Sequence, residues 1–277
     1  MTSDALTKYY CDYFCADDYS RLKQYLFYKF HLELPDPEDK NPDINYEYNG
    51  KDFSISTLNE WNEFLVFDNP NRYLWEKTDE MLAGIPVNPG ETVADIGCGG
   101  GFFTWRFSQA VGKEGHVYAT EINKDALSYL EEFIKISGTK NIHPLVAKMN
   151  DASLPEDSMD MVFMCSMYHA VYITDIEFVK DAFIESVRKA LKRTGRLVIV
   201  DNDITEPPVP SYYGPGISSQ LIIAQLGYYG FVLKKQFSLI PQRYVLIFEK
   251  DLNYVPPKKI ESEKRKDAQS EVQKLLR

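Results

Sequence analysis

The 277-residue sequence is poor in cysteine and histidine, with four of each, and this limits the chemistry open to it. Cys11 and Cys15 lie four residues apart without a C-x-x-C motif or a histidine partner. Cys98 and Cys165 are isolated, so we expect neither a disulfide framework nor a metal site. Cys11 and Cys15 are interpreted as small apolar side chains on one face of a helix.

Long hydrophobic runs and an excess of positive charge are also missing. No apolar run approaches the roughly 18 residues of a membrane span, and the first residues lack a basic start and a hydrophobic signal core. We therefore expect a cytoplasmic protein without a membrane partner. The formal net charge is −10, and the acidity is mostly amino-terminal. Such a chain lacks the basic surface that drives nucleic-acid binding, so nucleic acid is not an expected partner.

The most informative run that is present is D-I-G-C-G-G-G at residues 95–101. An apolar stretch precedes it and a helical pattern over residues 102–111 follows it, which predicts a strand, a glycine turn and a helix. Glycine can adopt positive φ and lets the backbone approach a ligand closely. The G-x-G-x-x-G motif of dinucleotide sites is absent, because Phe102 or Thr104 stands where its last glycine belongs.

Two acidic residues define the ligand further. Asp95 lies at the strand end, where a carboxylate attracts a cation and repels a pyrophosphate. S-adenosylmethionine carries both an ammonium and a sulfonium group. Residues 115–121 read as a second strand, and it ends in Glu121, 22 residues after Gly99, where an acid accepts hydrogen bonds from ribose hydroxyls. These features together favour S-adenosylmethionine as the cofactor.

Residues 93–122 resemble the class I S-adenosylmethionine-dependent methyltransferases. The resemblance extends from about residue 71 to about residue 250 and is closest to bacterial-type members of unassigned substrate, which carry a W-x-K-x-x-E-M-L pattern like that at residues 75–82. It implies an α/β, Rossmann-like fold with a seven-stranded, mostly parallel sheet closed by an antiparallel terminal hairpin. The tight connection between the strands expected at 231–239 and 244–248 also requires an antiparallel pair.

Three regions are expected along the chain. Residues 1–70 form a helical amino-terminal extension or lid, residues 71–250 the methyltransferase domain, and residues 251–277 a charged tail. The aromatic helix expected at 4–33 covers the site, forms a homodimer contact or is simply part of the core, and residues 34–50 read as a linker or loop. The remaining expected helices cover residues 57–67, 72–84, 102–111, 125–136, 175–191 and 217–226, and the other expected strands cover 141–146, 159–165 and 196–200.

Candidate cofactor-binding residues follow from the rule that ligands bind at the carboxyl ends of parallel strands. Glycines of the turn surround the methionine part, the end of the second strand holds the ribose, and the resemblance places an acid beside the adenine. For Asp151 a capping role in its own loop stays open. The candidates are Asp95, Gly97, Gly99, Gly101, Glu121, Ile122, Asp151 and Cys165.

Candidate catalytic residues follow the fourth predicted strand, where the family contacts both cofactor and acceptor. Tyr168 and His169 stand there in place of the Asn-Pro-Pro-Tyr of nucleobase N-methyltransferases. His169 can act as a base near neutral pH, or it can only hydrogen-bond the fold. Asp201 is a candidate for the acceptor pocket and Asp203 for a turn. The side chains of Arg72 and Trp75 either fold over the site or serve only in packing.

The sequence therefore predicts a methyltransferase that moves a methyl group from S-adenosylmethionine to a small-molecule or protein acceptor. Fold alone does not identify the acceptor. One alternative is a catalytically silent cofactor-binding or assembly module with the same fold. An NAD(P)-dependent oxidoreductase is disfavoured by the missing third glycine.

Overall fold

The computed structural model describes residues 46–48, 51–53, 76–173, 177–204, 215–241 and 243–256. The helices expected at 4–33 and 57–67 lie outside the described residues. The same holds for Cys11, Cys15, Arg72, Trp75 and most of the tail. The lid, the homodimer contact and the domain boundaries therefore stay predictions.

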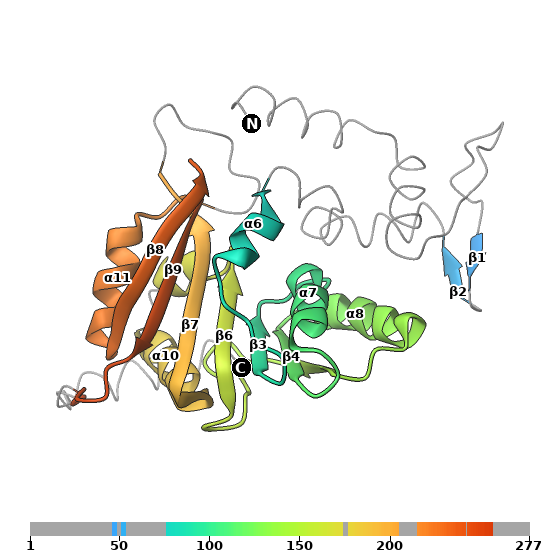
Figure 1. The fold of residues 1–277 in the computed structure, drawn as a ribbon, viewed down its shortest axis with the longest axis horizontal. Helices are drawn as coiled ribbons and strands as arrows, with labels where there is room; N and C mark the ends of the chain where they lie inside the picture. Colours follow the sequence, from blue (N-terminus) through green and yellow to red (C-terminus); the bar gives the residue numbers. More distant parts are fainter. Residues whose placement is uncertain are drawn as a thin grey trace, which may run out of the picture.

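A seven-stranded sheet forms the centre of the described chain, in the order β5-β4-β3-β6-β7-β9-β8 (Figure 1). The first five strands in this order run parallel, whereas β9 is antiparallel to both β7 and β8. This is the expected parallel sheet with an antiparallel terminal hairpin. The strands are β3 (Thr92–Ile96), β4 (His116–Glu121), β5 (Ile142–Val146), β6 (Met159–Cys165), β7 (Leu191–Asn202), β8 (Phe231–Ile240) and β9 (Arg243–Lys250).

Side chains of the central strands alternate between two hydrophobic layers, because successive residues of a strand point to opposite faces. In β6, Val162 and Met164 belong to one cluster, and Met161 and Phe163 belong to the other. The first cluster includes α10 (Glu177–Ala190) and α11 (Ser219–Tyr228). The second includes α6 (Thr78–Ala83), α7 (Phe102–Val111) and α8 (Lys124–Ser137). Helices therefore cover both faces of the sheet.

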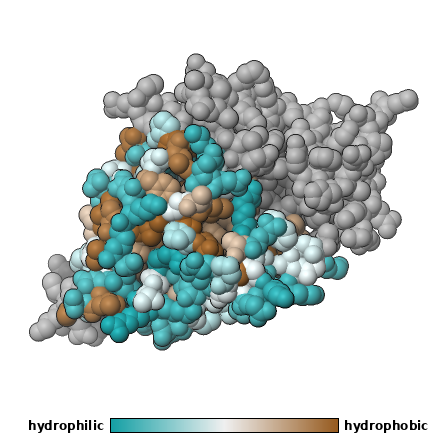
Figure 2. Space-filling model, viewed as in Figure 1, coloured by the Kyte–Doolittle hydropathy of each residue, from teal (hydrophilic) through white to brown (hydrophobic). Residues whose placement is uncertain are grey.

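Local signals explain where several helices begin and end. Asn123 is the N-cap of α8, and its side chain accepts hydrogen bonds from the backbone of Asp125 and Ala126. Gly138 ends the same helix at a φ of 68°, in the left-handed region. Figure 2 shows hydrophobic residues gathered in the upper middle of the described face, with hydrophilic residues around them.

Three local expectations need correction. Residues 34–50 are not all loop, because β1 (Tyr46–Tyr48) pairs antiparallel with β2 (Lys51–Phe53). The Asn-Gly sequence between these strands is a strong hairpin signal that the composition of the segment obscured. A short helix, α9 (Tyr168–Ile173), follows β6, where no helix was expected. Finally, β7 begins at Leu191, which pairs with Met159, rather than at residue 196.

Candidate functional site

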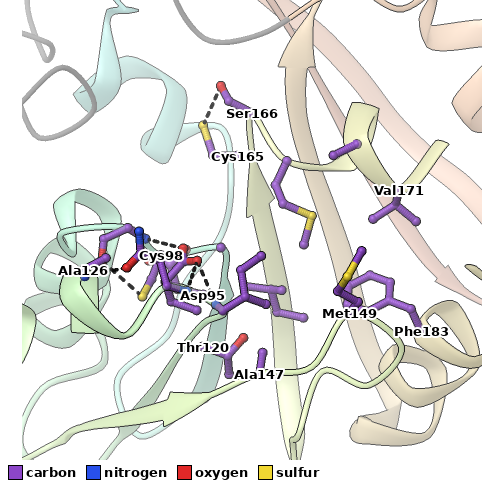
Figure 3. Close-up of a pocket in the computed structure, with 18 of the residues that line it drawn as sticks. Asp95, Cys98, Thr120, Ala126, Ala147, Met149, Cys165, Ser166, Val171 and Phe183 are labelled. Carbon is purple, nitrogen blue, oxygen red and sulfur yellow. Dashed lines mark hydrogen bonds between the residues drawn. The ribbon is translucent and has the colours of Figure 1, made fainter. Parts of the chain in front are cut away.

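A cavity of about 420 Å³ lies where the strand order reverses, between β3 and β6. In open α/β sheets this switch point opens a crevice at the carboxyl ends of the strands. Its volume lies within the roughly 300–1,000 Å³ of typical small-molecule sites. The wall comes from the ends of β3, β4, β5 and β6 and from helices α7 to α10 (Figure 3).

The glycine turn between β3 and α7 needs its glycines for two different reasons. Gly97, Gly99 and Gly101 have φ values of 70°, 51° and 94°, which disfavour other residues. A Cβ at Gly101 would lie 2.6 Å from Leu130 Cδ1, and one at Gly97 would lie 3.0 Å from Met167 Cγ. A Cβ at Gly99 would meet nothing within 4 Å, although Gly99 lines the cavity. Gly97 and Gly101 therefore allow close packing, and Gly99 leaves ligand space open.

Asp95 is the penultimate residue of β3 and lines the cavity. The residue is 2% exposed, and its Oδ2 accepts a hydrogen bond of 2.6 Å from the hydroxyl of Thr104. Beside it, burial raises the pKa of the Cys98 thiol well above its usual range, and the negative charges of Asp95 and Glu121 act in the same direction. Cys98 is therefore a neutral thiol in the cavity wall.

Glu121 ends β4 and holds the glycine turn directly. Its Oε2 accepts from the backbone N–H of Gly99 at 3.1 Å. Its Oε1 accepts from the N–H groups of Ile122 at 2.7 Å and Asn123 at 3.0 Å. An ionised carboxylate offers about four acceptor directions, so one direction remains for a ribose hydroxyl.

Two apolar side chains, Ile122 and Met149, lie at the cavity and are unusually exposed. Ile122 is 60% exposed after β4, and Met149 is 70% exposed after β5. Asp151, in contrast, is not part of the cavity wall. Its Oδ1 accepts from the backbone N–H of Ser153 at 2.8 Å, so the carboxylate caps its own turn. The structure therefore does not bring Asp151 together with the other candidates.

The turn after β6 forms the wall that faces the glycine turn. Cys165, Ser166 and Met167 all line the cavity (Figure 3). Ser166 has a φ of 53°, an unusual backbone for a residue other than glycine. Arg243 donates to the Ser166 hydroxyl at 2.8 Å and to the Cys165 sulfur at 3.0 Å. Cys165 thus lines the cavity and lies against an arginine that the sequence did not indicate.

His169 and Tyr168 follow on α9, but neither belongs to the cavity wall. His169 Nδ1 lies 2.9 Å from Asp201 Oδ1, and its backbone N–H donates to Oδ2 of the same carboxylate. Tyr168 is 1% exposed in the hydrophobic core and donates its hydroxyl to Gln225 at 2.6 Å. Burial raises the pKa of Tyr168 well above its usual range, so the phenol stays protonated. Asp203 accepts from the backbone of Ile204, as a turn residue does.

Several residues in and behind the cavity wall were not identified from the sequence. Met149 and Met167 follow predicted strands, so the strand-end rule could have identified them. Phe183 reaches the cavity from α10, and no motif marks it. Arg243 and Glu76, which lie 167 residues apart, form an ion pair of 2.9 Å that no local pattern indicates.

The described part of the chain has neither a metal-binding cluster nor a helix suited to span a membrane. Among these residues, no group of three or more His, Cys, Asp or Glu side chains is arranged to hold a metal ion. None of the described helices has both the length and the apolar composition needed to cross a membrane.

Two similar curated proteins carry the name of a C-methyltransferase. "Ubiquinone/menaquinone biosynthesis C-methyltransferase UbiE" of Vibrio vulnificus (strain YJ016) is 31% identical over 129 residues, covering 46% of each chain. The protein of the same name from Vibrio cholerae serotype O1 (strain ATCC 39315 / El Tor Inaba N16961) is 30% identical over 137 residues, covering 48% of this chain and 50% of its own. The chain thus matches about half the length of these curated relatives.

Solved structures share the fold. An S-adenosylmethionine-dependent methyltransferase from Aquifex aeolicus superposes with a TM-score of 0.60 at 22% identity, covering 68% of this chain and 96% of its own. A protein from Pyrococcus horikoshii OT3 gives a TM-score of 0.55 at 15% identity, covering 69% and 98%. At these identities the likeness shows the fold.

The family match extends across the site. The family model described as "Methyltransferase domain" matches residues 87–225, which is half of the chain. This range contains the glycine turn, Glu121 and the turn after β6. The family and the fold imply S-adenosylmethionine as the cofactor. The chain is a member of the methyltransferase-domain family.

Proposed function

We propose that the protein is an S-adenosylmethionine-dependent methyltransferase that acts on a small-molecule or protein acceptor. The observation that carries the proposal is the cavity at the switch point, which the glycine turn, Asp95 and Glu121 line together. The family match supports the reaction class, and the half-length match to the relatives leaves the acceptor open.

The residues of the cavity fit this cofactor. The carboxylates of Asp95 and Glu121 suit an ammonium group and a ribose hydroxyl, respectively. At Gly99 the space that a Cβ would occupy is open to a ligand. Ile122 and Met149 offer exposed apolar surface for a purine, which explains why large hydrophobic side chains stand uncovered there. When bound, the cofactor supplies an activated methyl group.

His169 and Asp201 form the pair best suited to handle a proton. An ionised carboxylate only accepts hydrogen bonds, so Nδ1 of His169 carries the hydrogen directed at Asp201. The lone pair then lies on Nε2, the nitrogen that can take a proton from an acceptor hydroxyl or carbon acid. Asp201 is fully buried and fixes the ring, while the His169 side chain is 11% exposed. Ser166 and Met167, three and two residues before His169 respectively, line the cavity and connect the pair to it.

The decisive experiment incubates the protein with methyl-labelled S-adenosylmethionine and a cell extract, and then identifies the labelled product. We expect transfer by the wild type and none by Gly99→Arg, because the arginine side chain would fill the open space of the cavity. Gly138→Arg is the matched control. Gly138 also has a positive φ and no neighbour within 4 Å, but it ends α8 away from the cavity.

Binding of S-adenosylhomocysteine, measured by calorimetry, separates the alternatives. Binding without any transfer would favour a silent cofactor-binding module. A wild type that neither binds S-adenosylhomocysteine nor transfers label would refute the proposal. Equal activity of Gly99→Arg and Gly138→Arg would show that the cofactor does not bind at the glycine turn.

A further inference from the structure

A buried polar cluster lies behind the cavity wall, and the proposed chemistry does not use it. Its centre is Arg243, the first residue of β9, whose side chain is 4% exposed. Its Nε lies 2.9 Å from Oε1 of Glu76, and its Nη1 donates to Asn202 Oδ1 at 3.1 Å. Burying an arginine and a glutamate is costly unless both are well paired, so their position calls for an explanation.

The third side of the guanidinium points to the turn after β6. Nη2 donates to the Ser166 hydroxyl at 2.8 Å and to the Cys165 sulfur at 3.0 Å. The backbone of Ser166 is held in the left-handed region, at a φ of 53°, which costs a residue other than glycine about 1 kcal/mol or more. The hydrogen bond from Arg243, together with the bond from Ser166 N–H to Val200 O, offsets this cost.

The strained backbone determines where Met167 lies. Met167 packs so closely on Gly97 that a Cβ there would come within 3.0 Å of its Cγ. Arg243 is thus connected through Ser166 and Met167 to the glycine turn, although it is not part of the cavity wall.

We propose that Arg243 is a positioning residue: anchored by Glu76 and Asn202, it holds residues 165–167 in the conformation that completes the cofactor cavity. The inference rests on the proposed function, because the cavity is taken to bind S-adenosylmethionine. It also explains the buried ion pair, since Glu76 neutralises the guanidinium while the guanidinium spans three separate segments.

The test measures binding of S-adenosylhomocysteine to the full chain by calorimetry. Arg243→Lys keeps a positive charge beside Glu76 but loses the planar fork, and we expect about tenfold weaker binding. Ser166→Ala, which removes the hydroxyl, should weaken binding similarly and leaves the ion pair intact. The double variant should bind no more weakly than either single variant, because both changes break one connection.

Arg196→Lys is the matched control, since Arg196 pairs with Glu91 at the opposite end of the sheet. We expect its affinity to stay within about twofold of the wild type. Unchanged affinity in both Arg243→Lys and Ser166→Ala would overturn the inference, and so would additive losses in the double variant. If Arg243→Lys does not fold, Ser166→Ala alone decides. A wild type that does not bind S-adenosylhomocysteine would instead refute the proposed function.

Discussion

An arginine–glutamate pair lies at the amino ends of the parallel strands and another at their carboxyl ends, and the two pairs differ in how deeply they are buried. At the amino end, Arg196 Nη2 lies 2.7 Å from Glu91 Oε2, with side chains 14% and 15% exposed. At the carboxyl end, Arg243 and Glu76 are 2.9 Å apart, with side chains 4% and 1% exposed. The same two residue types therefore occupy a partly hydrated site at one end and a dry site beside the cavity at the other.

Residues with positive φ occur at both ends of the sheet, and Gly90, Gly112 and Asp157 precede strands at the amino end. At the carboxyl end, positive φ values occur at Gly97, Gly99, Gly101 and Ser166, all within the turns that form or border the cavity. At the amino end, the guanidinium of Arg196 donates to the backbone oxygens of Pro86 and Asp160 and joins neighbouring segments. The residues with positive φ at the carboxyl end therefore shape the cavity, whereas Arg196 at the amino end connects segments of the sheet.

The largest expected effect comes from removing each arginine. Arg243→Met leaves Glu76 charged and buried, and it should lower the free energy of unfolding by about 3–5 kcal/mol. Arg196→Met should cost only about 1–2 kcal/mol, because Glu91 reaches water. Urea unfolding followed by circular dichroism measures both. Adding Glu76→Leu to Arg243→Met should recover part of the lost free energy of unfolding. Equal losses in Arg243→Met and Arg196→Met would contradict the expected difference between the two ion pairs.

The next effect compares Gly101, the N-cap of α7, with Gly138, the C-cap of α8. Gly101→Ala places a Cβ 2.6 Å from Leu130 at a φ of 94°, and it should destabilise the protein by about 1–3 kcal/mol. Gly138→Ala has a φ of 68° in the left-handed region and no neighbour within 4 Å, so it should cost about 1 kcal/mol. Thermal unfolding midpoints distinguish the variants. A larger loss for Gly138→Ala would show that packing at the cavity end is looser than the structure has it.

The smallest effect is the pH dependence at the amino end. Burial alone would raise the pKa of Glu91, but hydrogen bonds from Arg196 and Asn88 outweigh it and hold the pKa below its ordinary value of 4.5. The unfolded chain thus binds a proton more readily than the folded one, so Glu91 stabilises the fold above about pH 4.5 and loses this contribution as the pH falls through its lowered pKa.

The test measures the urea concentration at which half of the protein is unfolded, at several pH values from 7 down to 3. Glu91→Gln should show a shallower fall than the wild type below about pH 4.5. Its midpoint at pH 7 should already be lower, because the charge on residue 91 is gone. Parallel curves for the two proteins would mean that Glu91 titrates alike in the folded and unfolded chains.

Much of the fold could be predicted because its signals are local. The bounds of α7 and β6 agree with the predicted ranges, and Asn123 caps α8 as expected. The misses have local reasons too. The β1–β2 hairpin follows an Asn-Gly signal inside a polar segment, and α9 is too short for a periodic pattern. The early start of β7 depends on the pairing of Leu191 with Met159, which sequence patterns do not contain.

Some candidate site residues line the cavity as predicted from their positions along the strands, and others do not. Asp95, Gly97, Gly99, Glu121, Ile122 and Cys165 line the cavity because each stands at the end of a parallel strand or in the turn after it. Gly101 borders the cavity as the N-cap of α7. Asp151 and Tyr168 also follow strands, but one caps its own turn and the other enters the core. Position along a strand predicts proximity to the site, whereas the direction of the side chain depends on packing.

The sequence by itself determined the order of strands and helices, the glycine turn with its two acids, and the class of cofactor, because periodicity and glycine spacing are properties of neighbouring residues. Only the tertiary structure placed Arg243 between Glu76, Asn202 and Ser166, and only it paired His169 with Asp201. These partners lie between 32 and 167 residues apart in the chain. Contacts over such separations arise when the sheet closes, and no local pattern encodes them.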